Sequence, residues 1–134
     1  MNCTFGHVCL FVNNREKEAD FYCNQLGLKR MFSMNFPNSE TAAIYVRIAP
    51  GQFLELIGNY PKGEKSQVGF GHLCLHVNDI NKAHRELTEK GLTPTAIKTG
   101  TAKCLQFFLY DPEGNAIEFM QLTPDSLQTI HDHD

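Results

Sequence analysis

Two histidines and two glutamates recur at almost the same spacing along this chain of 134 residues. His7 and His72 are 65 residues apart, and Glu55 and Glu118 are 63 residues apart. Imidazole nitrogens and carboxylate oxygens bind divalent transition metals, and a carboxylate beside such an ion can also move a proton. The four residues therefore point to one metal centre with acid–base chemistry, provided that the fold brings them together.

A repeated segment gives the reason to expect that they meet. Residues 6–13, Gly-His-Val-Cys-Leu-Phe-Val-Asn, return as residues 71–78, Gly-His-Leu-Cys-Leu-His-Val-Asn. Each copy alternates as a β-strand does, which places its histidine on one face together with the cysteine two residues later. Glu55 and Glu118 lie in later segments that also match, so the duplication covers almost the whole chain.

Both glutamates interrupt apolar strands, which are Phe-Leu-Glu-Leu-Ile over 53–57 and Ala-Ile-Glu-Phe-Met over 116–120. A carboxylate in such a strand costs free energy unless something compensates it. A single strand histidine or glutamate is ordinarily packed or solvated. The repeat, however, places both pairs on the same side of one sheet, which favours a metal site. A donor set without thiolate suits Ni, Co, Zn, Mn or Fe(II), and composition does not choose among them.

The strands and helices that position these residues follow the same repeat. In the first half the pattern predicts a helix over 15–25 and strands over 5–13, 28–36, 42–48 and 52–58. In the second half it predicts a helix over 80–90 and strands over 70–77, 92–97, 104–110 and 115–121. Each half is thus expected to be a β-α-β-β-β module.

The chain is expected to form a single domain over residues 1–122. Its two modules span residues 5–58 and 70–122, and a linker over 59–69, which contains proline, glycine and charged residues, joins them. We expect the tail over 123–134 to add one short helix and then to fray at its end.

Composition excludes several classes of function. A net charge of −3 gives no general attraction to nucleic acid or to an anionic membrane. No run approaches 18 apolar residues and the first residues lack a signal-peptide pattern, so we expect neither a membrane span nor secretion. The five cysteines are an odd number without disulfide-like spacing, which predicts reduced thiols and a cytoplasmic protein.

Three motifs together carry a resemblance to a known family. They are Gly-His-x-x-Leu-x-Val opening each half, Phe-Tyr followed by Leu-Gly-Leu over 21–28, and Asp-Pro-Glu-Gly-Asn over 111–115. In this combination the chain resembles the vicinal oxygen chelate superfamily. The resemblance implies an α+β, glyoxalase-like fold, in which two tandem modules form a curved mixed sheet with helices on its outer face. It also implies that the sheet cups a metal held by His7, Glu55, His72 and Glu118.

Within that superfamily, a full His-Glu-His-Glu set resembles bacterial glyoxalase I. The resemblance implies a metal-dependent lyase that converts a hemithioacetal of methylglyoxal and a thiol to a lactoyl thioester through an enediolate. Glu118 or Glu55 would act as the base. The implied metal is Ni or Co, with Zn as the alternative, and the implied substrate is a small-molecule thiol adduct. A homodimer is expected, with the site either inside one chain or shared between two.

Six further residues are expected to contact the substrate: Asn59, Phe11, His76, Lys103, Phe108 and Met120. Asn59 matches a position that contacts glutathione in glyoxalase I. Phe11 stands where that enzyme typically has an arginine for a glutathione carboxylate, and a phenyl ring cannot make a charge-assisted bond. The resemblance therefore supports the metal chemistry better than the thiol specificity.

Two other functions stay open on the sequence alone. One is another metalloenzyme of the same superfamily, either an epimerase, an isomerase or an extradiol-type dioxygenase. Extradiol dioxygenases use two histidines and one glutamate, and methylmalonyl-CoA epimerase typically has glutamine at the position of Glu55. The other is a ligand-sequestering resistance protein, a class that usually lacks the metal ligands.

Overall fold

The computed structural model describes residues 1–37, 41–58, 69–110, 112 and 114–133. The first module contains β1 (Thr4–Val12), α1 (Arg15–Asp20), the π-helical turn η1 (Phe21–Gln25), β2 (Lys29–Asn35), β3 (Ala42–Ala49) and β4 (Gln52–Gly58). The second contains β5 (Gly69–His76), α2 (Ile80–Glu89), β6 (Lys98–Thr99), β7 (Leu105–Tyr110) and β8 (Ala116–Gln121), after which α3 (Leu127–His131) follows. The predicted α+β fold of two β-α-β-β-β modules is confirmed.

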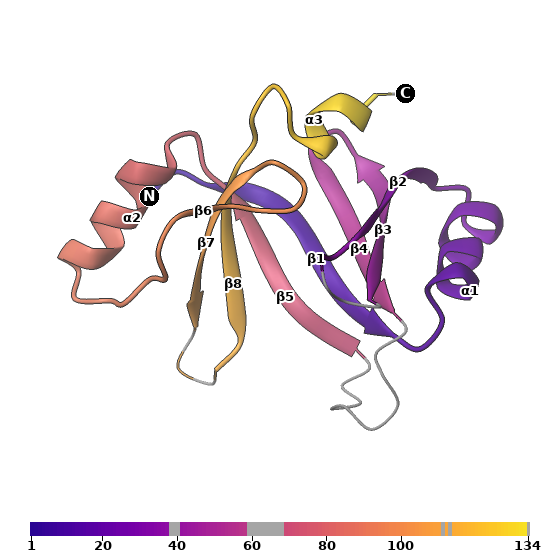
Figure 1. Ribbon diagram of the computed structural model, residues 1–134, viewed down its shortest axis with the longest axis horizontal. Coiled ribbons are helices and arrows are strands. Elements are labelled where there is room, and N and C mark those ends of the chain that lie inside the picture. The colour runs from indigo at the N-terminus through magenta and orange to yellow at the C-terminus, as the bar shows by residue number, and fades with distance from the viewer. Residues whose placement is uncertain (38–40, 59–68, 111, 113, 134) are drawn as a thin grey trace.

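All the strands join one eight-stranded sheet in the order β2-β3-β4-β1-β5-β8-β7-β6. The two modules meet where β1 pairs antiparallel with β5. β4 runs parallel to β1 on one side of this pair, and β8 runs parallel to β5 on the other. The first and last strands of both modules are therefore the four central strands, while α1 and α2 lie at opposite ends of the molecule (Figure 1). In the described residues no helix is long and apolar enough to span a membrane.

Each module has its own apolar core between its helix and the sheet. The core of the first module is built from Val12, Ala19, Ile44, Val46, Leu54 and Leu56. The core of the second is built from Val77, Ile80, Ala83, Leu87, Phe107 and Phe119. Because side chains alternate along a strand, the glutamate between Leu54 and Leu56 faces the opposite side of the sheet, and so does the glutamate before Phe119.

The turns from strand to helix end in a side-chain cap in both modules. Asn14 Oδ1 accepts a hydrogen bond from the N–H of Lys17 at 3.1 Å, and Asp79 Oδ1 accepts one from the N–H of Lys82 at 3.0 Å. Side-chain caps of this kind satisfy backbone donors that a helix start leaves free.

The first helix differs from its prediction over 15–25, because its second half is the π-helical turn η1.

The strand predicted over 92–97 is wrong, since that stretch is irregular and β6 contains only Lys98 and Thr99. Pro94 has no N–H to give to a strand ladder. The N–H of Phe108 instead donates a hydrogen bond to the side-chain hydroxyl of Thr95 at 2.8 Å. The predicted linker lies outside the described residues except for its last member, which begins β5.

The prediction that the tail frays is wrong for His131 and Asp132, which are docked on the first module. Asp132 accepts hydrogen bonds from Arg47 Nε and from the N–H of Gly51, each at 2.8 Å. The ring of His131 lies over that of Phe32, with centroids 5.3 Å apart. These contacts dock the segment that follows the second module onto β2, β3 and the β3–β4 turn of the first (Figure 1).

Two equivalent glycines allow β1 and β5 to approach each other. A Cβ atom at Gly71 would lie 2.8 Å from Cys9 Sγ, and one at Gly6 would lie 2.9 Å from Cys74 Sγ. Contacts this short do not occur without displacement of the neighbour. The glycine of each module thus leaves room for the cysteine of the other.

We expect Gly71→Ala to lower the free energy of unfolding by about 1–3 kcal/mol, because the added methyl overpacks a close contact. Combining it with Cys9→Ala removes the sulfur that the methyl meets. The free energy of unfolding lost by the double variant should therefore be about 1 kcal/mol smaller than the sum of the two single losses. Urea denaturation of all four proteins measures this difference, and strictly additive losses would contradict the proposed contact.

Candidate metal centre

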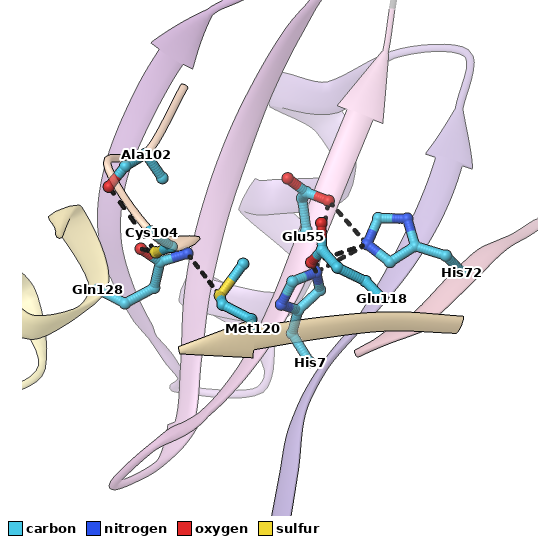
Figure 2. A network of polar contacts seen from close by, with 8 residues as sticks. All are labelled: His7, Glu55, His72, Ala102, Cys104, Glu118, Met120 and Gln128. Carbon is cyan, nitrogen blue, oxygen red and sulfur yellow. Dashed lines mark hydrogen bonds and ion pairs between the residues drawn. The ribbon is translucent and has the colours of Figure 1, made fainter. Parts of the chain in front are cut away.

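The side chains of His7, Glu55, His72 and Glu118 converge on the face of the sheet opposite the two module cores (Figure 2). His7 Nε2 lies 2.8 Å from His72 Nε2, 3.6 Å from Glu55 Oε1 and 3.5 Å from Glu118 Oε1. His72 Nε2 lies 3.6 and 3.7 Å from the same two oxygens. The structure therefore brings together, within one chain, all four residues predicted as metal ligands.

These separations fit a shared cation. Ligand atoms about 2.1 Å from a divalent metal lie about 3.0 Å apart at right angles and about 3.4 Å apart at tetrahedral angles. The separations of 2.8 to 3.7 Å span both values. Glu118 Oε1 is buried and, among the described residues, has no hydrogen-bond partner. Such an oxygen is what a missing cation would satisfy.

Charge gives a second argument for a cation. Burial raises the pKa of Glu55 to about 7, and burial together with repulsion from Glu55 raises the pKa of Glu118 to about 8. Burial lowers the pKa of His72 to about 4 and holds that of His7 well below its ordinary value. Both imidazoles are therefore neutral at physiological pH and give the carboxylates no positive charge. A divalent cation would balance two ionised carboxylates.

The repeated cysteines hold the two carboxylates in equivalent ways. Cys9 pairs with Glu55 between β1 and β4, and Cys74 pairs with Glu118 between β5 and β8. Each thiol donates a hydrogen bond to its carboxylate, which lowers the pKa of that carboxylate. This role was not predicted from the sequence, although the presence of a cysteine at the same position of both repeats indicated it.

A second set of close donor atoms includes a thiol: one ligand atom each of His7, Cys74 and Glu118 lie within 4.8 Å of one another. Burial and the charge of Glu118 raise the pKa of the Cys74 thiol well above its ordinary value. Metals bind the thiolate rather than the thiol. The set of two histidines and two glutamates is therefore the better fit.

One residue breaks the symmetry between the modules. Tyr45 lies opposite Glu55 in the β3–β4 pair, and its hydroxyl donates a second hydrogen bond to that carboxylate. The equivalent residue opposite Glu118 in the β7–β8 pair is Phe108, which has no hydroxyl. Glu55 thus has two side-chain donors and Glu118 has one. Sequence reasoning missed Tyr45, although the register of the predicted hairpin placed it opposite Glu55.

A cavity of about 160 Å³ adjoins the four side chains, with Glu55, His72 and Glu118 in its lining. Two of the residues predicted to contact substrate, Phe108 and Met120, also line it. Gln128 in α3 supports this wall, because its Nε2 donates to Met120 Sδ at 3.9 Å (Figure 2). The docked C-terminal segment therefore contributes to the shape of the site.

The other predicted substrate contacts lie elsewhere. Phe11 packs against the apolar cluster beside the cavity, and Lys103 is exposed on the loop before β7. His76 lies over Gly6 and lines a separate hollow formed with residues 1–4. Asn59 lies outside the described residues.

Comparison with known proteins finds one matching family and several sequence relatives. Residues 4–119 match the sequence profile of the Glyoxalase/Bleomycin resistance protein/Dioxygenase superfamily. The chain is 31% identical over 124 residues to a lactoylglutathione lyase of Neisseria meningitidis, covering 86% of this chain and 88% of that protein. It is 29% identical over 124 residues to a probable lactoylglutathione lyase of Synechocystis sp., covering 86% and 92% of the two chains.

Among solved structures, methylmalonyl-CoA epimerase from Mycobacterium tuberculosis superposes on the chain with a TM-score of 0.78. The match covers 90% of this chain and 88% of the epimerase, at 18% sequence identity. At that level of identity the likeness concerns the fold alone.

The metal-free protein should lose stability as the pH rises from about 6.5 to about 8. In that window Glu55 and Glu118, with pKa values of about 7 and about 8, hold protons in the folded chain, whereas unfolded glutamates are ionised. Because the folded state binds more protons, raising the pH favours unfolding by about 1–2 kcal/mol in total. Below pH 6.5 the lowered pKa of His72 has the opposite effect. Urea denaturation at several pH values measures this change.

A divalent cation should remove this loss, because it binds the ionised carboxylates. The double variant Glu55→Gln with Glu118→Gln should show a much weaker pH dependence, and Glu89→Gln, an exposed position on α2, should match the original protein. A metal-free protein that gains stability across the same window would contradict the burial of two protonated carboxyl groups.

Proposed function

Because the chain belongs to the Glyoxalase/Bleomycin resistance protein/Dioxygenase superfamily, we propose that it is a metal-dependent lyase of the glyoxalase I type. It converts the hemithioacetal of methylglyoxal and a thiol to a lactoyl thioester. The observation that carries the proposal is the convergence of two imidazoles and two buried carboxylates beside one cavity. The identity of 31% to a lactoylglutathione lyase supports the choice of reaction.

In this proposal His7, Glu55, His72 and Glu118 hold the cation. The donors are nitrogen and oxygen only, which suits several divalent transition metals. The resemblance to bacterial glyoxalase I favours Ni or Co among them, with Zn as the alternative. When bound, the cation supplies Lewis acidity, which stabilises negative charge developing on two adjacent substrate oxygens. The predicted homodimer stays a prediction, since the four side chains already meet within one chain.

Glu118 is the better base of the two glutamates. It removes the proton from the carbon that carries the sulfur and returns it to the neighbouring carbonyl carbon, so the reaction is an isomerisation without an oxidant. Glu55 is restrained by Tyr45 and Cys9, whereas Glu118 has Cys74 alone and one oxygen without a partner among the described residues.

An epimerase of an acyl thioester is the second candidate. Two carboxylates on one site could take a proton from one face of a carbon and return it to the other face. The chain's fold is also found in methylmalonyl-CoA epimerase. Incubation with an acyl thioester in heavy water, followed by mass spectrometry, separates the two: an epimerase incorporates deuterium beside the thioester carbonyl without needing methylglyoxal.

We expect Glu118→Gln to lower kcat by about 100-fold or more at saturating metal, because it removes the proton acceptor. Glu55→Gln should chiefly raise the metal concentration needed for activity. Formation of the thioester from methylglyoxal and a thiol measures both effects. The exposed Glu89→Gln variant serves as the control with unchanged kcat.

Metal bound by each variant is measured in parallel, so that loss of metal is not mistaken for loss of the base. Glu118→Gln protein that binds metal and still turns over normally would contradict the assignment of the base. A metal-loaded original protein that forms no thioester would contradict the proposed reaction.

A further inference from the structure

The cavity wall beyond the metal-binding side chains is uncharged in the described part of the chain. The first module contributes an apolar part, formed by Met34, Phe36 and Ile57. The second contributes Phe108 and two neutral polar groups, which are the hydroxyl of Thr101 and the amide of Gln106. A substrate group that enters this cavity beyond the oxygens near the metal would pack against this wall.

The apolar part is a packed surface that extends behind the wall. Ile57 belongs to a buried cluster with Cys9 and Ala43, and the rings of Phe11 and Phe36 pack against that cluster. A carboxylate placed there would lose its hydration and, among the described residues of this cluster, find no donor to replace it, which is strongly unfavourable. An alkyl or aryl group would gain free energy by leaving water at the same place.

The polar part is held in place and is neutral. Gly100 lies directly against the amide of Gln106, where a side chain at residue 100 would collide with it. Lys98, opposite Gln106 in the β6–β7 pair, and Lys103 are both exposed. A solvated lysine at the protein surface adds little to the binding of an anion. This side of the cavity therefore suits a neutral hydrogen-bonding group.

We infer that the site takes a substrate whose group beyond the two chelating oxygens is uncharged and mainly apolar. The inference rests on the proposed function, because it takes those oxygens to bind a cation at the four side chains. It disfavours adducts of glutathione, a tripeptide with two carboxylates and an ammonium group. It favours adducts of a neutral thiol, or an aryl or alkyl 2-oxoaldehyde.

Two hydroxamates test this preference without any turnover. Each presents two adjacent oxygens to a metal. Benzohydroxamate carries an unsubstituted phenyl group, whereas para-carboxybenzohydroxamate carries a carboxylate on that ring. Calorimetry with the Ni-loaded protein should show benzohydroxamate binding about tenfold tighter or more. Equal binding, or tighter binding of the carboxylate, would overturn the inference.

A matched pair of variants locates the preference on the wall. Phe36→Arg places a cation beside the apolar part and should shift the ratio of the two affinities about tenfold toward the carboxylate. Phe36→Leu keeps the wall neutral and should preserve the original ratio. An unchanged ratio in folded, metal-loaded Phe36→Arg protein would overturn the assignment of this surface.

Kinetics separate failure of this inference from failure of the proposed function. Turnover of glutathione adducts with the same kcat/KM as adducts of glutathione diethyl ester would refute the preference while leaving the reaction intact. Selective binding of benzohydroxamate by a protein that turns over no hemithioacetal would refute the reaction and support the preference. If neither hydroxamate binds the metal-loaded protein, both proposals fail.

Discussion

The burial of two carboxylates beside two neutral imidazoles is the constraint around which the molecule is organised. Glu55 and Glu118 are 4% and 5% exposed, and no described lysine or arginine lines their cavity. Two protons can neutralise the pair, as the raised pKa values of both groups indicate. A divalent cation neutralises it as well, and it would use the same oxygens. In the folded chain, protons and a metal would therefore compete for the same carboxylate oxygens.

The duplicated fold creates this constraint by simple means. The pairing of β1 with β5 places the first strands of both modules at the centre, with the last strands of both modules beside them. Each central strand then contributes one of the four proposed ligands, and each cysteine of the repeat holds the carboxylate next to it. Chemical asymmetry enters through Tyr45 and Phe108, which occupy equivalent positions but differ by one hydroxyl group. In the proposed mechanism that difference gives the two equivalent carboxylates unlike roles.

The repeat in the sequence was sufficient to predict both modules and the convergence of the four side chains. Strand parity fixed the side of the sheet on which each lies. Contacts between distant segments were not predictable in this way: the ion pair of Asp132 with Arg47 depends on how α3 returns to the first module. The irregular stretch over 92–97 was mistaken for a strand, because the pattern did not show that Thr95 would use its side chain as an acceptor.

X-ray absorption spectroscopy of the protein loaded with one equivalent of Zn²⁺ tests the central claim most directly. The account predicts two imidazoles together with oxygen ligands, all about 2.0–2.2 Å from the metal. Replacing His7 or His72 with alanine should remove one imidazole from the spectrum. A sulfur about 2.3 Å from the metal would show that Cys74 or Cys9 binds it, and a spectrum without imidazole would place the metal elsewhere. Either result would contradict the account.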